Sequence, residues 1–140
     1  MRPGLRRCLT LRNQRAEIAR MHTWTEGLAI PFGLSQRTLN ALQLCLEEAV
    51  NNIISHAFAP GSEHHIRVAV WRDGTTVHAE VVDDGAPFDP LAHAQPGAPT
   101  ELASAPIVGA GIKLMRSFAE RIAYRRADGT NRLLLSFPAP

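Results

Sequence analysis

Residues 44–58 read LCLEEAVNNIISHAF. Apolar residues recur here every three or four positions, which predicts a helix, and Ser35 is a suitable N-cap for it. Glu48, Asn52 and His56 follow one another at intervals of four and therefore lie on nearly one side of that helix. A carboxylate one turn from a carboxamide offers a proton acceptor beside an oxygen ligand for Mg²⁺ held mainly by phosphates and waters. Taken alone, this spacing is more often just the solvated side of a helix.

The periodicity on both sides of this helix predicts an α+β fold. Alternating apolar residues indicate strands, and Asp73-Gly74 and Asp128-Gly129 are typical hairpin turns. The expected order is a strand at 5–11, helices at 13–29 (capped by Asn13) and 35–58, strands at 65–72 and 77–83, a helix at 110–121, and strands at 122–127 and 132–137. We expect one domain over 1–140, a two-layer sandwich with helices on one face of a mixed, mostly antiparallel sheet.

A second candidate cluster is VVDDGAPFDP, residues 81–90. An acidic residue that leaves an apolar strand for a glycine turn can present its carboxylate to the exocyclic amine of a base. Gly85 would let the backbone come close to the ligand. The alternative is an ordinary strand-end turn, for which Asp-Asp-Gly is common material, and the residues alone favour neither interpretation.

A third candidate cluster, GAGIKLM at residues 109–115, follows a long Pro, Gly, Ala and Ser-rich segment. Glycines that open a helix expose free N–H groups and the positive end of the helix dipole, which together bind phosphate. Lys113 could add a positive charge, although a solvated helix lysine is the commoner interpretation. The segment at about 86–108 has the length of a functional or mobile loop.

Bulk composition narrows the class of protein. The net charge is +2, with 15 Lys and Arg against 13 Asp and Glu, which is too small and too scattered to indicate nucleic-acid binding. No apolar run approaches the roughly 20 residues of a membrane span. Cys8 and Cys45 have neither CxxC nor metal-ligand spacing, so we expect two buried, reduced thiols and a cytoplasmic protein.

The order and spacing of the three clusters resemble the anti-sigma factor serine-protein kinase family of the histidine-kinase-like ATPase superfamily. The similarity lies in the helix at 44–58, the turn at 83–90, and the glycine helix start with its later hairpin at 109–135. It extends over about residues 5 to 137. The sequence departs from the family pattern at Pro87 and Glu120, and in its Ala/Pro-rich loop, without losing an expected ligand.

The resemblance implies roles for individual residues in binding ATP and Mg²⁺. Asn52 would ligate Mg²⁺, Asp83 would accept a hydrogen bond from the adenine amine, and Gly85 would keep the base close. Glu48 would be the general base that takes a proton from a serine hydroxyl of a partner protein.

Further roles concern the phosphates and the edge of the site. Gly109 and Gly111 would open the lid helix toward the phosphates, and Lys113 is a weaker candidate for a phosphate contact. His56 would either border the nucleotide or only pack at the end of its helix.

The resemblance also implies partners. One is a sigma factor held inactive, and the other is an anti-sigma factor antagonist whose serine is phosphorylated. A homodimer is a further expectation. Two alternatives stay open: a non-catalytic regulator that binds nucleotide or protein on the same fold, and a detached sensor histidine kinase catalytic module.

Overall fold

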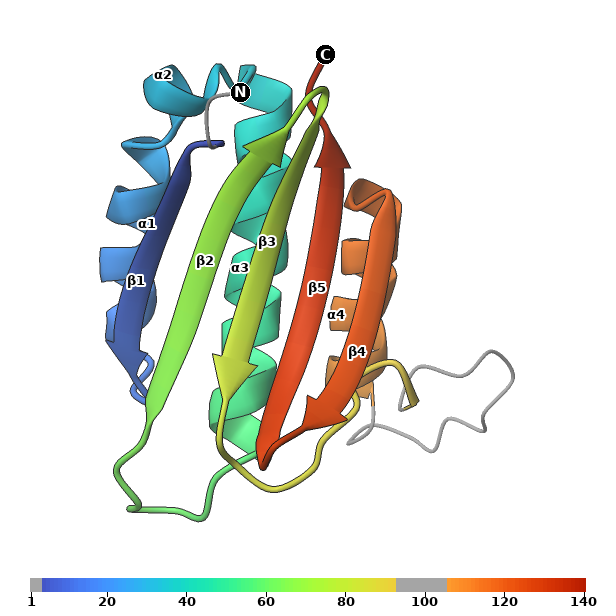
Figure 1. Cartoon of the computed structure of the whole chain (residues 1–140). Helices are drawn as coiled ribbons and strands as arrows, with labels where there is room; N and C mark the ends of the chain where they lie inside the picture. Colours follow the sequence, from blue (N-terminus) through green and yellow to red (C-terminus); the bar gives the residue numbers. More distant parts are fainter. Residues whose placement is uncertain (1–3, 93–105) are drawn as a thin grey trace.

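The computed structural model describes residues 4–92 and 106–140 (Figure 1). Its elements in chain order are β1 Arg6–Arg12, α1 Glu17–Glu26, α2 Ala29–Phe32, α3 Gln36–His56, β2 His65–Asp73, β3 Thr76–Asp83, α4 Pro106–Phe118, β4 Arg121–Ala127 and β5 Thr130–Pro138. The strands form one sheet in the order β1-β2-β3-β5-β4. The expected α+β architecture is therefore confirmed.

All four strand pairings are antiparallel, so the sheet is not mixed over the described strands. Tight hairpins join β2 to β3 and β4 to β5. Because a tight turn reverses the direction of the chain, each of these two pairs is antiparallel. The segment that contains α4 carries the chain from β3 to β4, which runs parallel to β3. No parallel pair forms because β5 lies between those two strands.

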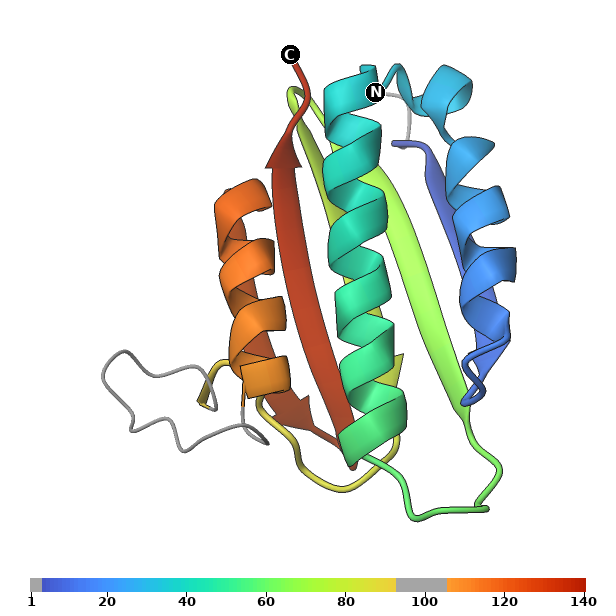
Figure 2. The ribbon, with the colours of Figure 1, turned by 180° about the vertical axis from the view of Figure 1, so that it is seen from behind.

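Helices α1, α3 and α4 lie on one face of the sheet, with α3 in the middle (Figure 2). Leu42, Leu46 and Val50 of α3 are completely buried against the inward side chains of the strands, such as Val68 and Leu135. Burial of this apolar surface is the main stabilising contribution to the two-layer arrangement.

The long helix α3 begins and ends close to the expected positions. Ser35 is confirmed as its N-cap, because the Ser35 side chain accepts a hydrogen bond from the Thr38 N–H at 3.1 Å. The helix has 21 residues and runs along the sheet (Figure 2). Its C-terminal half therefore reaches the end of the sheet at which β3 ends and β5 begins.

The N-terminal helix differs from the expectation in two ways. It begins at Glu17, and Asn13 does not cap it: the Asn13 side chain donates to Ser62 O at 2.8 Å and accepts from His64 N–H at 2.9 Å. The helical segment is also divided into α1 and α2, and Pro31 lies within α2. Asn13 thus joins the N-terminal region to the loop that follows α3, a contact that local spacing could not reveal.

The two cysteines have different environments, which corrects the expectation that both are buried. Cys45 is buried on α3, and burial raises the pKa of its thiol to about 12. Cys8 is exposed, because it alternates along β1 with Leu11 and Leu9, which face the helices. Within the described parts of the chain, no helix is long and apolar enough to cross a membrane.

Candidate functional site

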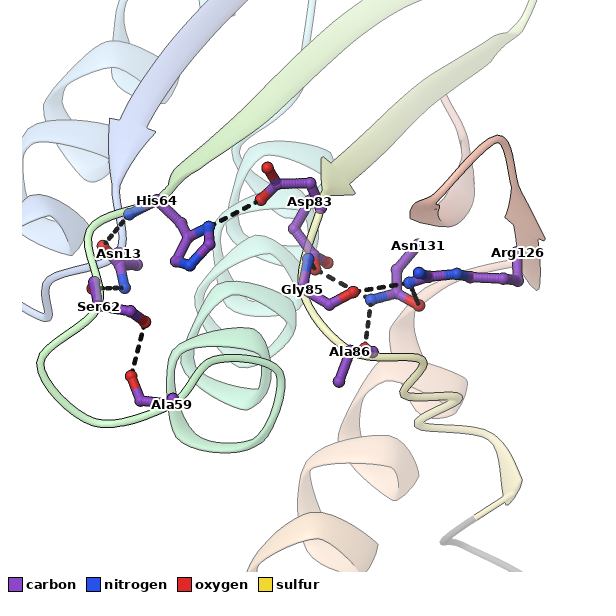
Figure 3. Close-up of polar contacts among 10 residues, drawn as sticks. Asn13, Ala59, Ser62, His64, Asp83, Gly85, Ala86, Arg126 and Asn131 are labelled. Atoms are coloured by element: carbon purple, nitrogen blue, oxygen red, sulfur yellow. Dashed lines mark hydrogen bonds and ion pairs between the residues drawn. The ribbon is translucent and has the colours of Figure 1, made fainter.

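The candidate site lies where the end of β3 meets the start of β5 beside α3. Asp83 is the last residue of β3, and only 2% of its surface is exposed. Its Oδ1 accepts hydrogen bonds from the Gly85 N–H at 2.9 Å and from Asn131 Nδ2 at 3.0 Å (Figure 3). Its Oδ2 is buried and has no hydrogen-bond partner among the described residues. One oxygen of the carboxylate is therefore used within the fold, and the other could accept a hydrogen bond from a ligand.

Burial raises the pKa of Asp83 above its ordinary value. The hydrogen bonds from Asn131 and Gly85 act in the opposite direction, and the nearby charge of Asp84 adds a smaller upward contribution. Burial makes the charged form of a carboxylate unfavourable, and a hydrogen bond donated to its free oxygen stabilises that charged form. The electrostatics of Asp83 thus favour a ligand that donates a hydrogen bond.

Gly85 is where the loop after β3 touches the end of α3. A Cβ at this position would collide with the carbonyl oxygen of Ala57, so the backbone approach requires glycine. The Ala86 N–H donates to the same Ala57 carbonyl at 2.8 Å. On the other side, Arg126 Nη1 donates to Gly85 O at 2.7 Å, as Figure 3 shows. These contacts attach the turn to α3 on one side and to β4 on the other.

Glu48 and Asn52 meet the first half of α4 at Gly111. A Cβ on Gly111 would lie 2.5 Å from Glu48 Oε2 and 3.8 Å from Asn52 Nδ2, so only glycine allows this helix packing without displacing Glu48. Asn52 is 4% exposed, and its Nδ2 has no hydrogen-bond partner in the described structure. Burial, and to a smaller extent the charge of Glu47, raises the pKa of Glu48. The expected proton acceptor and metal ligand therefore lie together.

A small cavity connects the two groups of residues. Its walls are mainly apolar and carry a few polar side chains, the usual character of a small-molecule site; it is lined by Ala49, Asn52, Ile53, Val81, Asp83, Phe88, Pro90, Tyr124, Asn131 and Leu133. Its volume is about 20 Å³, enough for about one water molecule. A purine ring would therefore enter only if side chains of the segment that follows β3, such as Phe88, moved outward.

The remaining predicted site residues lie at the rim or away from the cavity. His56 is exposed, and its ring stacks on Phe88 with the centroids 5.0 Å apart, so it borders the cavity through Phe88. Lys113 is exposed on α4. Gly109 and Gly111 lie inside α4 rather than before it, because this helix begins at Pro106. Most of the expected loop at 86–108 lies outside the described residues.

Three residues of the site were not singled out from the sequence: Asn131, Tyr124 and Arg126. Asn131 is 4% exposed and contacts both other residues as well as Asp83. Asn131 was detectable in principle, since it alternates along β5 with buried Leu133 and is thus a polar residue in the inward register.

The donors and acceptors of the site fit an adenine nucleotide. Asp83 Oδ2 is a buried acceptor suited to an exocyclic amine, and the Asn52 amide offers an oxygen of the kind that Mg²⁺ accepts. The described residues contain no group of three or more His, Cys, Asp or Glu side chains placed to hold a metal ion. A metal here would depend on phosphate oxygens and water for most of its ligands, and bound ATP would provide the phosphate oxygens.

Solved structures share this fold. The RsbU and RsbW domains of a Mycobacterium tuberculosis protein match with a TM-score of 0.64 at 14% identity, over 98% of this chain and 34% of that chain. The histidine kinase domain of a blue-light-activated histidine kinase from Erythrobacter litoralis matches with a TM-score of 0.50 at 15% identity, over 89% and 60%. This chain thus spans about a third of the first solved chain. At such identities, the likeness establishes the fold.

Sequence comparison establishes the family. The serine/threonine-protein kinase BtrW of Bordetella bronchiseptica is 37% identical over 113 residues, which are 81% of this chain and 80% of that protein. The family model for the histidine kinase-like ATPase domain matches residues 11–137, a range that includes every residue of the site described above. The resemblance inferred from the motifs is confirmed, and the chain belongs to the histidine kinase-like ATPase domain family, as a relative of the kinase BtrW.

Proposed function

We propose that the chain is an ATP-dependent serine-protein kinase and anti-sigma factor that phosphorylates a serine of an anti-sigma factor antagonist. The observation that carries this proposal is the position of Glu48. Its carboxylate lies against Gly111 and one turn of α3 from Asn52, and Asn52 lines the same small cavity as Asp83, whose Oδ2 has no partner among the described residues. The relative named as a serine/threonine-protein kinase supports the same activity.

In this proposal, the cavity would bind the adenine of Mg-ATP after Phe88 has moved outward to enlarge it. Asp83 accepts a hydrogen bond from the exocyclic amine, and the close approach at Gly85 holds the turn against the base. Asn52 would offer its amide oxygen to Mg²⁺, and the first turn of α4, which begins at Pro106 and includes Gly109, would bind the phosphates. His56 and Lys113 have peripheral roles, because both are exposed. The nucleotide supplies the phosphoryl group, and the protein supplies position and charge compensation.

Glu48 acts as the general base. Partial burial raises the pKa of its carboxyl, which makes the carboxylate a stronger proton acceptor than an exposed glutamate. It would take the proton from the serine hydroxyl as the oxygen attacks the γ-phosphorus. The proton then resides on the Glu48 carboxylate, and the bond to the leaving ADP breaks.

The proposed partners are proteins. In the unphosphorylated state, the antagonist would bind this chain and free the sigma factor, and phosphorylation would release the antagonist. We place this exchange in the cytoplasm and expect a homodimer, as the motif resemblance implies. If the chain is instead a non-catalytic regulator, it would still bind nucleotide or partner but form no phosphoserine.

The test compares two adjacent glutamates. Proteins captured from an extract of the source cells on the immobilised chain are incubated with Mg-ATP, and phosphoserine is mapped by mass spectrometry. Glu48→Gln should slow phosphoserine formation by about 10²–10⁴-fold, the usual contribution of a general base. Glu47→Gln is the matched control and should remain close to wild type. Equal rates for Glu48→Gln and wild type would overturn the assignment, and the absence of any phosphoserine would favour the non-catalytic regulator.

A further inference from the structure

Asn131 stands directly opposite Asp83 in the antiparallel pairing of β3 with β5. Its side chain lies on the inward side of the sheet and is 4% exposed. Figure 3 shows its amide between the end of β3, the turn at Gly85 and Arg126 of β4. A buried amide must satisfy both of its ends within the protein, since an unpaired buried donor or acceptor costs about 1–3 kcal/mol.

The hydrogen bonds of Asn131 determine which way its amide points. Its Oδ1 accepts from Tyr124 Oη at 2.5 Å, from Arg126 Nη1 at 3.2 Å and from the Phe88 N–H at 3.2 Å. Its Nδ2 donates to Asp83 Oδ1 at 3.0 Å and to Ala86 O at 2.9 Å. Turning the amide over would place its NH₂ group against the Arg126 and Phe88 donors, so the amide nitrogen must face Asp83.

This orientation decides which oxygen of Asp83 is used within the fold. Asp83 Oδ1 receives both Asn131 Nδ2 and the Gly85 N–H, and this pair of donors holds the carboxylate in one rotamer. Oδ2 is left as a buried acceptor in the residue that lines the cavity. A carboxylate without these donors would be free to rotate, or to take up a proton and become a donor itself.

We propose that Asn131 is a positioning residue that determines base specificity: by orienting Asp83, it makes the cavity select a 6-amino purine over a 6-oxo purine. This inference rests on the proposed nucleotide-binding function. The amine of adenine would donate to Asp83 Oδ2, whereas the carbonyl oxygen of hypoxanthine or guanine would place one acceptor against another. A polar site built for one hydrogen-bonding partner discriminates strongly against an analogue that leaves its buried group unpaired.

The tendency of Asp83 to become protonated explains why the selection depends on a neighbour. Burial raises the pKa of Asp83, and the hydrogen bond from Asn131 counteracts that effect. Without the donor, protonation of Asp83 becomes easier, and a protonated carboxyl can donate to a 6-oxo group. Loss of Asn131 Nδ2 should therefore weaken ATP binding and relatively favour ITP.

The test measures dissociation constants for Mg-ATP and Mg-ITP by isothermal titration calorimetry. Asn131→Asp keeps the shape and an acceptor oxygen for Tyr124, Arg126 and Phe88, but it removes the donor to Asp83. It should lower the preference for ATP over ITP by about tenfold or more, the value of a hydrogen bond to a charged group. A purely structural defect would weaken both nucleotides together. Arg125→Ala, at an exposed position of β4, is the control and should keep the wild-type ratio.

Two further variants keep the test decisive if Asn131→Asp does not fold. Asn131→Ala also removes the donor, and it adds no buried charge. The double variant Tyr124→Phe/Arg126→Ala keeps Asn131 but removes both side-chain donors that fix its amide. Each should lower the ratio in the same direction, the double variant by less.

The outcomes separate this inference from the proposed function. A wild type that prefers ATP, with folded Asn131 variants that keep the full preference, overturns the role of Asn131 and leaves the proposed function intact. If only the double variant folds, an unchanged ratio there overturns the role as well. A wild type that binds neither nucleotide overturns both the proposed function and this inference.

Discussion

Replacing Asp83 with asparagine should remove most of the stabilisation that adenine nucleotides give to the protein. The substitution preserves the shape of the side chain and keeps an acceptor for Gly85 and Asn131, which both donate to Oδ1. The new NH₂ group therefore takes the place of Oδ2, the oxygen without a described partner. There it would face the adenine amine, donor against donor, and the hydrogen bond to the base is lost.

The magnitude follows from ligand linkage. Nucleotide at about 100 times its dissociation constant stabilises the folded state by about 2.7 kcal/mol. For a chain of 140 residues, this corresponds to an increase in Tm of about 9 °C, at about 3–4 °C per kcal/mol. Loss of a hydrogen bond to a charged group costs about 1.5–3 kcal/mol in binding. At the same nucleotide concentration, the stabilisation should fall to about 0.3–1.3 kcal/mol and the shift to about 1–4 °C.

The assay is differential scanning fluorimetry with ATP, ADP and GTP, with and without Mg²⁺. Asp84→Asn is the matched control, because Asp84 is the exposed neighbour whose carboxylate contacts His64 at 3.1 Å instead of lining this cavity. The control should keep the full shift with ATP and ADP. A wild-type shift in Asp83→Asn, or an equal loss of the shift in Asp84→Asn, would show that Asp83 does not contact the base.

The same variant has a second, ligand-free consequence that depends on pH. Because burial raises the pKa of Asp83 in the folded state, the native protein binds this proton more readily than the unfolded chain does. The wild type therefore loses stability as the pH rises through the elevated pKa, and Asp83→Asn does not. Urea denaturation without nucleotide should show the variant at least as stable as wild type at neutral pH, with the advantage disappearing below about pH 4.

Three further predictions concern packing and charge. Gly85→Ala should lower the free energy of unfolding by about 1–3 kcal/mol, because its Cβ collides with the backbone of Ala57. Gly27→Ala is the control: its nearest contact is at 3.4 Å, and it should change this free energy by about 0.5 kcal/mol or less. Equal effects of the two variants in urea denaturation would contradict this prediction. Gly111→Ala should slow phosphoryl transfer but lower Tm less than Gly85→Ala does, because its Cβ meets the flexible end of the Glu48 side chain and not the backbone. A decrease in Tm as large as that of Gly85→Ala would argue against this explanation. Glu17→Gln should lower the free energy of unfolding by about 0.2–1 kcal/mol at neutral pH, because the hydrogen bond from Arg20 lowers the pKa of Glu17 to about 2. This contribution is present above about pH 4 and is lost as the pH falls through 2. A difference in stability that persists at lower pH would refute this role of Glu17.

Local sequence patterns were sufficient to predict the helices and strands and to select most of the candidate site residues. The alternation along β2 and β3 and the Ser35 cap of α3 depend on neighbours in the chain, so their signals are present in the sequence. The start of the helix expected over 13–29 was wrong for the converse reason, although residues 17–26 are helical as expected. Asn13 bonds to the distant loop at Ser62 and His64, and such a contact leaves no periodic signal.

The antiparallel character of the whole sheet was also decided by tertiary structure. The sequence showed two hairpins and the elements between them, and these are compatible with more than one strand order. In the structure, β5 lies between β3 and β4, and α3 and α4 pack side by side on one face of the sheet. Packing of this kind involves residues distant in the chain, which sequence periodicity does not relate.

The sequence alone is enough to identify the three clusters, their order and the types of side chain that each would offer a nucleotide. The folded structure was needed to identify the available oxygen of Asp83, because that depends on Asn131, 48 positions further along the chain. It also placed Gly111 against Glu48, which no spacing along one helix could indicate. The physical reason is that residue chemistry and helical period are local properties, whereas the direction of a buried hydrogen bond depends on every partner that surrounds it.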